Sequence, residues 1–109
     1  MEKNVRMCML LDIYFSLLTQ KQQECMRLYY EEDLSLSEIS ELLSISRQGV
    51  RDCLKKAENA LEHMERELKL LKKELKLEKL LNGLKELKLS AVDGLIAQFE
   101  QASEDDNGI

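Results

Sequence analysis

The sequence predicts an all-α protein, and its composition and apolar spacing both support that fold class. Proline is absent from the 109 residues and glycine occurs only four times, so few residues oppose helix formation. Leucine, glutamate, lysine and methionine, which favour helices, are abundant. Apolar residues recur at helical spacing along most of the chain. A chain of this length is expected to form one compact domain with an appended helical arm.

The first predicted helix covers residues 4–18 and is apolar around most of its circumference. Its apolar side chains are Val5, Met7, Cys8, Leu10, Leu11, Tyr14, Phe15, Leu17 and Leu18. One core face needs fewer apolar residues, so we predict that this helix contacts both its own domain and a second subunit. The stretch is too short to span a bilayer and Asp12 interrupts it, so neither a membrane anchor nor export is expected.

A second helix is predicted from Thr19 to about Asp33, because Thr19 and Gln22 have the spacing of a capping box. Its predicted inward face consists of Cys25, Met26, Tyr29 and Tyr30.

The residue pattern over positions 33–56 predicts a helix-turn-helix. Ser35 and Glu38 have capping-box spacing at the start of a short apolar helix, and residues 44–46 interrupt the apolar pattern before Val50 resumes it. Arginine can bond guanine through two hydrogen bonds and glutamine can bond adenine in the same way, so duplex DNA is the predicted partner of the second helix. The candidate nucleic-acid-binding residues are Ser46, which caps this helix, Arg47, Gln48, Arg51, Lys55 and Lys56.

The charge distribution favours a local binding site. A net charge of −5 argues against a protein that coats nucleic acid indiscriminately. Residues 46–59, however, contain four basic side chains and only two acidic ones, Asp52 and Glu58. Asp52 would repel phosphates unless it points to solvent or accepts from a cytosine amino group. Gly49 costs about 1 kcal/mol of helix stability relative to alanine, which fits either a close approach of DNA or neutral drift.

The second helix of the motif is predicted to continue unbroken to Leu80, about 50 Å in all. Its apolar residues follow the steps of four and three of a heptad seam: Val50, Leu54, Ala57, Leu61, Met64, Leu68, Leu71 and Leu75. Other leucines between residues 68 and 89 lie off this line. Two apolar faces require two partners, so we predict a homodimer, with a break or bend near residues 82–83.

Three regions are predicted along the chain. Residues 1–62 form the helix-turn-helix domain, residues 63–102 form a leucine-rich arm within the same compact unit, and residues 103–109 form a disordered acidic tail. Ser90 and Asp93 are expected to cap a last helix that ends near Gln101. The lysine run of residues 69–79 could bind RNA phosphates or an anionic membrane, but the interspersed glutamates favour a solvated flank.

No catalytic or metal chemistry is predicted. Cys8, Cys25 and Cys53 include no C-x-x-C pair and lie in apolar runs, so buried reduced thiols are expected, as in the cytoplasm. His63 has no cysteine or carboxylate set at metal-ligand spacing and is expected on the surface. Carboxylates do not converge and no phosphate-binding glycine loop is present, so neither an enzyme nor a cofactor is expected.

The stretch from Leu18 to Leu61 resembles region four of the bacterial sigma factors, a helix-turn-helix that reads promoter DNA. The matching features are the LT-x-x-Q start and the SLSEI-x-x-LL-x-IS core. Together with the MLLDIYFSLLT opening and the leucine-lysine-glutamate arm, nearly the whole chain is similar to the YlxM family of DNA-binding regulators of Gram-positive bacteria. The resemblance implies an all-α fold and a regulatory role in the pathway of the signal recognition particle.

Sigma-type recognition positions fall by resemblance on Arg47, Gln48, Arg51 and Asp52, with Ser46 as cap and phosphate contact. The sequence departs from the sigma pattern at Ser40, where alanine is usual, and at Ser44, where glycine is usual. A left-handed Ser44 would cost roughly 1–2 kcal/mol relative to glycine, unless the turn is remodelled.

Two functions are compatible with these features. The first is a dimeric DNA-binding regulator of the signal recognition particle pathway. The second is an interaction module that binds a protein or the RNA of that particle, with the helix-turn-helix as an inherited scaffold.

Overall fold

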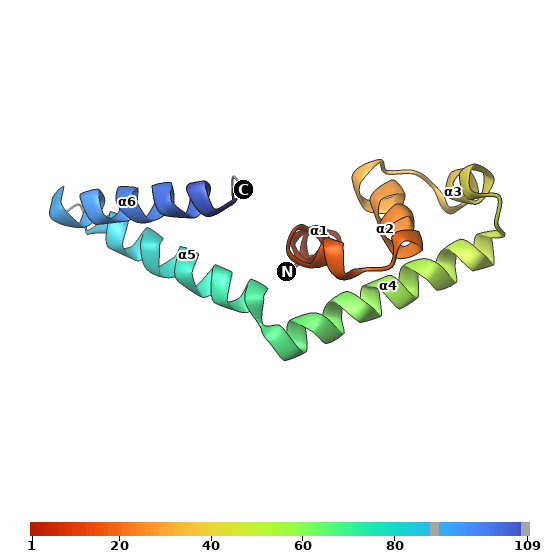
Figure 1. Cartoon of the computed structure of the whole chain (residues 1–109), viewed down its shortest axis with the longest axis horizontal. Coiled ribbons are helices and arrows are strands. Elements are labelled where there is room, and N and C mark those ends of the chain that lie inside the picture. The colour runs from red at the N-terminus through yellow and green to blue at the C-terminus, as the bar shows by residue number, and fades with distance from the viewer. Residues whose placement is uncertain (88–89, 108–109) are drawn as a thin grey trace. The chain divides into compact units, whose positions relative to one another are not determined.

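The computed structural model describes residues 1–87 and 90–107, and the side chains of residues 1–87 and 91–103. The described residues form six α-helices and no strand (Figure 1), which confirms the predicted fold class. The chain divides into two compact units, Met1–Leu71 and Lys72–Ile109. The structure therefore places the division after Leu71, whereas the sequence prediction placed it after Glu62 and expected a single compact unit.

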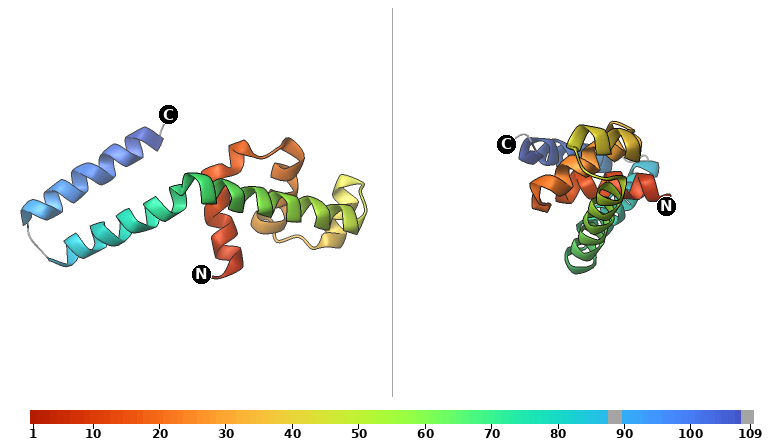
Figure 2. Two further views of the ribbon diagram at one scale, coloured as in Figure 1. Left: turned by 90° about the horizontal axis from the view of Figure 1, so that it is seen from below. Right: turned by 90° about the vertical axis from the view of Figure 1, so that its right-hand side faces the viewer.

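The first unit is built around one long helix, α4 (Arg47–Leu68). The elements before it are α1 (Lys3–Tyr14), the 3-10 turn η1 (Phe15–Leu17), α2 (Gln20–Met26), the π-helical turn η2 (Arg27–Glu31) and α3 (Leu36–Leu43). Helices α1, α2 and α3 all contact α4 (Figure 1). Figure 2 shows α1 crossing the C-terminal half of α4, while α3 lies beside its N-terminal end.

The ends of the early helices agree in part with the sequence pattern. The first helix ends at Tyr14 and is followed by the 3-10 turn, earlier than the predicted end at Leu18. The Thr19 capping box is confirmed, since the Thr19 Oγ1 accepts from the Gln22 backbone N–H at 3.2 Å and the Gln22 Oε1 accepts from the Thr19 N–H at 3.0 Å. Asp33, at the predicted end of the second helix, has a left-handed φ of 54°.

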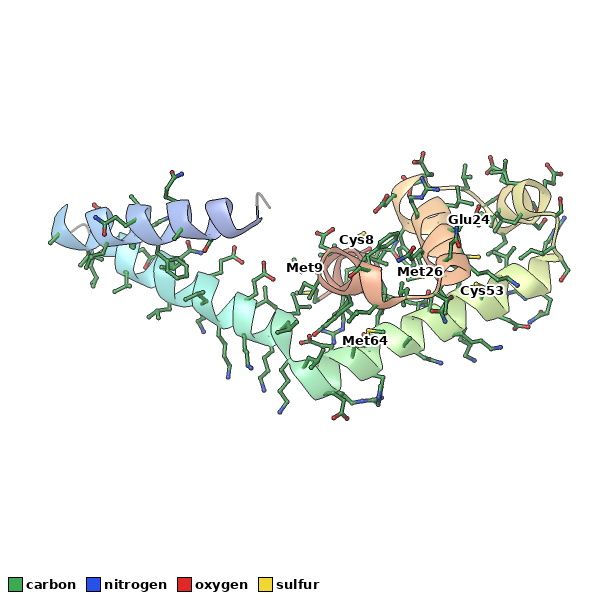
Figure 3. The ribbon with its side chains drawn as sticks, in the orientation of Figure 1. Cys8, Met9, Glu24, Met26, Cys53 and Met64 are labelled. Atoms are coloured by element: carbon green, nitrogen blue, oxygen red, sulfur yellow. The ribbon has the colours of Figure 1, made fainter. Side chains whose placement is uncertain are left out.

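The core of the first unit lies where its helices meet α4. Its buried apolar side chains are Met7, Leu10, Leu11, Tyr14, Leu18, Cys25, Met26, Ile39, Val50, Cys53, Leu54, Ala57, Leu61 and Leu71. The apolar line of α4 is therefore covered by this chain's own helices as far as Leu61. Met64 also faces α1 (Figure 3).

The predicted unbroken helix over residues 47–80 is wrong. α4 ends at Leu68, and Lys69 adopts a left-handed conformation with φ 56°. A new helix, α5 (Leu70–Glu86), begins at the next residue. Lysine adopts this conformation only at an energetic cost, so contacts elsewhere must hold the break in place.

Those contacts come from Tyr14 and Glu65, which together satisfy the start of α5. The Tyr14 hydroxyl donates to Glu65 Oε1 at 2.8 Å and accepts from the Leu70 backbone N–H at 3.2 Å. The same carboxylate oxygen accepts from the Leu71 N–H at 3.0 Å. Backbone N–H groups in the first turn of a helix have no partner within that helix, so α1 and α4 supply the cap that α5 lacks in its own sequence. We call these three hydrogen bonds the Tyr14–Glu65 cap.

The second unit consists of most of α5 and of α6 (Ser90–Asn107), which turns back alongside α5 (Figure 2). Lys85 Nζ forms an ion pair with Glu100 Oε1 at 2.6 Å. The predicted break or bend near residues 82–83 is misplaced, because α5 continues through both and ends at Glu86. The last helix extends to Asn107, beyond the predicted end at Gln101 and into the segment expected to be disordered. Residues 108–109 and the predicted cap by the Ser90 side chain lie outside what the structure describes.

The burial of the cysteines follows the prediction at two positions out of three. Cys25 and Cys53 are buried, and burial raises the pKa of Cys25 to about 12. Cys8 is exposed, contrary to the prediction, because it lies on the side of α1 that faces away from α4 (Figure 3). His63 is exposed, as expected. Within the described residues, no helix is both long and apolar enough to cross a membrane, and no three potential metal-ligand side chains are grouped together.

An ion pair between α1 and α4 predicts a modest loss of stability in acid. Arg6 donates to both carboxylate oxygens of Glu62, at 2.7 and 2.8 Å, and this lowers the pKa of Glu62. Its contribution is complete above the unfolded-state pKa of about 4.3 and is lost as the pH falls through the lower folded-state value. Both side chains are about a third exposed, so the effect should stay below about 1 kcal/mol. Melting temperatures of the wild type and Glu62→Gln between pH 3 and 6 should converge at the acid end; parallel curves would contradict the assignment.

Candidate nucleic-acid interface

The helix before the predicted recognition helix is fixed at both ends. The Ser35 Oγ accepts from the Glu38 backbone N–H at 3.1 Å, and Glu38 Oε1 accepts from the Ser35 N–H at 3.0 Å. The Ser35 backbone N–H that donates to the carboxylate lowers the pKa of Glu38, and the Ser35 side chain lowers it further. Ile39 of this helix is fully buried, and α3 contacts α4. The predicted capping box of α3 is therefore confirmed. The apolar face expected of Ile39, Leu42 and Leu43 is confirmed only in part, because Leu42 is 63% exposed. Through Ile39, α3 holds the first turns of α4 in position.

A left-handed serine makes the corner between α3 and α4. Ser44 has φ 56° and ψ 42°, and its N–H donates to the Ser40 carbonyl. The Ile45 N–H donates to the same carbonyl at 3.1 Å. The turn thus keeps the left-handed residue of a helix-turn-helix although serine stands in place of glycine.

Ser46 caps α4, as the sequence predicts. Its Oγ accepts from the Gly49 backbone N–H at 2.9 Å. A Cβ at Gly49 would lie 3.2 Å from that oxygen and 3.7 Å from the Ile45 Cδ1. The corner's own packing therefore gives glycine a reason at this position, in addition to the two alternatives that the sequence left open.

All six candidate nucleic-acid-binding residues have exposed side chains: Ser46, Arg47, Gln48, Arg51, Lys55 and Lys56. The structure divides them between two flanks of α4. Arg51 and Lys55 line one hollow of about 310 Å³, together with residues of α1, η2 and α3. Lys56 lines another of about 320 Å³, beside Thr19, Lys21 and Gln22 of the α2 start. The two hollows share no residue of α4, so Arg51 and Lys56 lie on different sides of this helix.

The two acids of this region already have partners. Gln48 Nε2 donates to Asp52 Oδ1 at 2.8 Å, and Arg51 Nη1 approaches Gln48 Oε1 at 3.5 Å, the outer limit of a hydrogen bond. Glu58 accepts from the Tyr30 hydroxyl at 2.6 Å and pairs with Lys3 Nζ at 3.2 Å. Burial and the Glu58 contact raise the pKa of Tyr30. Asp52 thus accepts from a side chain of its own helix, and this bond uses one of the two N–H donors that Gln48 could offer to a base.

Lys21 and Lys3 border the interface but were missed by the sequence reasoning. Lys21 shares the hollow of Lys56, and Lys3 shares that of Arg51. Both precede the helix-turn-helix motif in the chain and reach its flanks only because α1 and α2 pack on α4. No local sequence signal marks them.

Comparison with known proteins places the chain in a family. Residues 1–101 match the UPF0122 family, described as "Putative helix-turn-helix protein, YlxM / p13 like". The chain belongs to this family. Among its UPF0122 relatives, one from Clostridium botulinum is 48% identical over 89 residues, which covers 81% of this chain and 82% of the relative. A second, from Bacillus cereus, is 49% identical over 87 residues, covering 80% and 79%. A third, from Caldanaerobacter subterraneus, is 51% identical over 80 residues, covering 73% and 68%.

The left-handed conformation of Ser44 is expected to lower the stability of this member of the UPF0122 family. Ser44→Gly should raise the free energy of unfolding by about 0.5–1 kcal/mol, because glycine adopts φ 56° without the steric cost that serine bears. Ser37→Gly, inside α3, should lower it by a similar amount. Urea unfolding of both variants measures the two effects. A loss of stability in Ser44→Gly would contradict the left-handed assignment.

Proposed function

We propose that this chain is a DNA-binding regulatory protein of the signal recognition particle pathway, with α4 as its recognition helix. The observation that carries the proposal is the row of exposed cationic side chains at Arg47, Arg51 and Lys55, directly after a capped left-handed corner. Guanidinium groups on the first turns of such a helix can reach guanine edges while ammonium groups contact phosphates. The family description as a helix-turn-helix protein supports DNA binding. The link to the particle rests on the resemblance to the YlxM family.

We also propose that the protein acts as a homodimer, so that two copies of α4 contact two half-sites of one DNA duplex. Large apolar side chains exposed on α5 and α6 support a second copy as their cover.

Fluorescence anisotropy with the protein's own promoter region and a random duplex of equal length, at several salt concentrations, tests DNA recognition. The proposal expects tighter binding to the promoter and an affinity that falls with salt. Equal affinity for both duplexes at every salt concentration would refute a sequence-specific regulator.

Arg51→Ala should weaken binding to the preferred duplex by about 1–3 kcal/mol and relax base preference, because it removes a base-edge contact. Lys55→Ala should weaken binding to both duplexes alike and reduce the salt slope by about one, as loss of a phosphate contact does. Arg66→Ala is the matched control, since Arg66 is exposed on the last turn of the same helix, away from the corner. An equal loss in Arg66→Ala would indicate nonspecific attraction.

The second candidate function is an interaction module for a protein or the RNA of the signal recognition particle. It is favoured by the Gln48–Asp52 bond, which occupies the reading face, and by Leu42, which is 63% exposed on α3. A competition assay that offers duplex DNA and particle RNA together separates the two functions. Preferential RNA binding that survives Arg51→Ala would favour the second.

A further inference from the structure

The second unit cannot cover its own apolar side chains. Among the side chains that the structure describes between residues 72 and 103, Ile96 is the one large apolar group that is buried, with 4% exposed. Others remain between 39% and 66% exposed: Leu77, Leu80, Leu87, Leu95 and Phe99. Units shorter than about 40 residues usually need a disulfide, a metal or oligomerisation to be stable. No described cysteine or metal-ligand cluster supplies either of the first two.

The two helices of this unit carry opposite charge. α5 bears lysines at 72, 73, 76, 79 and 85 against glutamates at 74, 78 and 86, so its balance is basic. α6 contains acidic residues and neither lysine nor arginine. The pair between Lys85 and Glu100, at 2.6 Å, is an instance of this attraction within one chain. Both side chains are about half exposed, so the attraction is screened and acts mainly on orientation.

We propose that the α5–α6 hairpin binds the same hairpin of a second copy, with the basic α5 of each copy against the acidic α6 of the other. In a two-fold symmetric contact the same surface serves both partners, so one basic and one acidic helix complement themselves in this arrangement. Pairing α5 with the partner's α5 would instead bring like charges together. The exposed leucines and Phe99 supply the apolar area, and the charges select the orientation. The inference rests on the homodimer of the proposed function and names its contact surface.

Charge reversal with mixing tests the helix pairing. One variant carries Lys76→Glu and Lys79→Glu, and the other carries Asp93→Lys and Glu100→Lys. Each variant alone should dimerise about tenfold more weakly than the wild type, as sedimentation equilibrium measures it, because like charges then meet across the contact. An equimolar mixture should recover the wild-type affinity as a heterodimer, which native mass spectrometry identifies. The pairing would be overturned if both variants, each measured alone, dimerised with wild-type affinity. It would also be overturned if the mixture dimerised no more tightly than either variant alone.

Two leucines of equal exposure test where the contact lies. Leu80 on α5 and Leu17 in η1 are each 59% exposed, so a glutamate at either position leaves its own unit's core intact. Leu80→Glu should weaken the dimer about thirtyfold or more, and Leu17→Glu should leave it unchanged. If Leu17→Glu weakened the dimer and Leu80→Glu did not, the contact would lie near η1 and the proposal would be overturned. A wild-type monomer at all concentrations would do the same.

DNA affinity, measured on the same samples, distinguishes the failure of the DNA-binding proposal from the failure of the hairpin contact. A dimer that responds to Leu80→Glu but shows no duplex preference would sustain the hairpin contact and refute the regulator. A duplex-specific protein whose mass ignores every hairpin variant would sustain DNA binding and refute the contact.

Discussion

Replacing Glu65 by alanine is expected to lower the free energy of unfolding by about 2–4 kcal/mol. Glu65 is 8% exposed, and one of its oxygens accepts from both the Tyr14 hydroxyl and the Leu71 backbone N–H. Alanine would leave these two donors short of an acceptor in a region that water barely reaches. The loss is a large fraction of the 5–15 kcal/mol that stabilises a typical small domain.

Two further variants sharpen this test of the Tyr14–Glu65 cap. Tyr14→Phe keeps the ring in the core but removes the hydroxyl, which leaves the Leu70 N–H without its acceptor, so it should cost about 1–3 kcal/mol. Glu67→Ala removes an exposed carboxylate from the same turn of α4 and should change stability by less than about 0.5 kcal/mol. Urea unfolding monitored by circular dichroism gives all three values. If Glu65→Ala costs no more than Glu67→Ala, the cap does not stabilise the first unit.

The same cap shows why part of the fold could not be predicted from the sequence. The helix starts at Thr19, Ser35 and Ser46 depend on residues three positions apart, so the local pattern was sufficient to place them. The break at Lys69 has no glycine or proline to mark it. It depends on Tyr14, 51 residues before Glu65 in the chain, and such a contact is invisible to a search for local periodicity.

A similar division holds for the candidate interface. The exposed positions of Arg47 and Arg51 were predictable because both residues follow a recognisable corner in the chain. Lys21 was not, because it reaches the flank of α4 only through the packing of α2. The prediction that α4 continues unbroken to Leu80 failed for a related reason, because the heptad spacing runs on across the break at Lys69. Heptad spacing describes an apolar line along one side of a helix, but it does not say whether the chain's own helices or a partner cover that line.

Ile39→Ala is expected to cost about 2–5 kcal/mol of stability, because it removes a fully buried side chain between α3 and α4. The cavity would lie behind the corner that positions the first turns of α4. Duplex affinity should therefore fall as well, even at a temperature where circular dichroism shows the chain still folded. Thermal unfolding and anisotropy on the same preparation measure the two effects together.

Leu42→Ala is the matched control for this variant, since Leu42 lies on the same short helix but is 63% exposed. Its stability should change by less than about 0.5 kcal/mol. Equal losses at the two positions would contradict the assignment of α3's buried face. The control also bears on function, because an exposed leucine that contributes nothing to folding is available to a partner. If Leu42→Ala leaves both stability and duplex affinity unchanged yet weakens binding to a particle component, α3 is a docking surface and the interaction module becomes the better account.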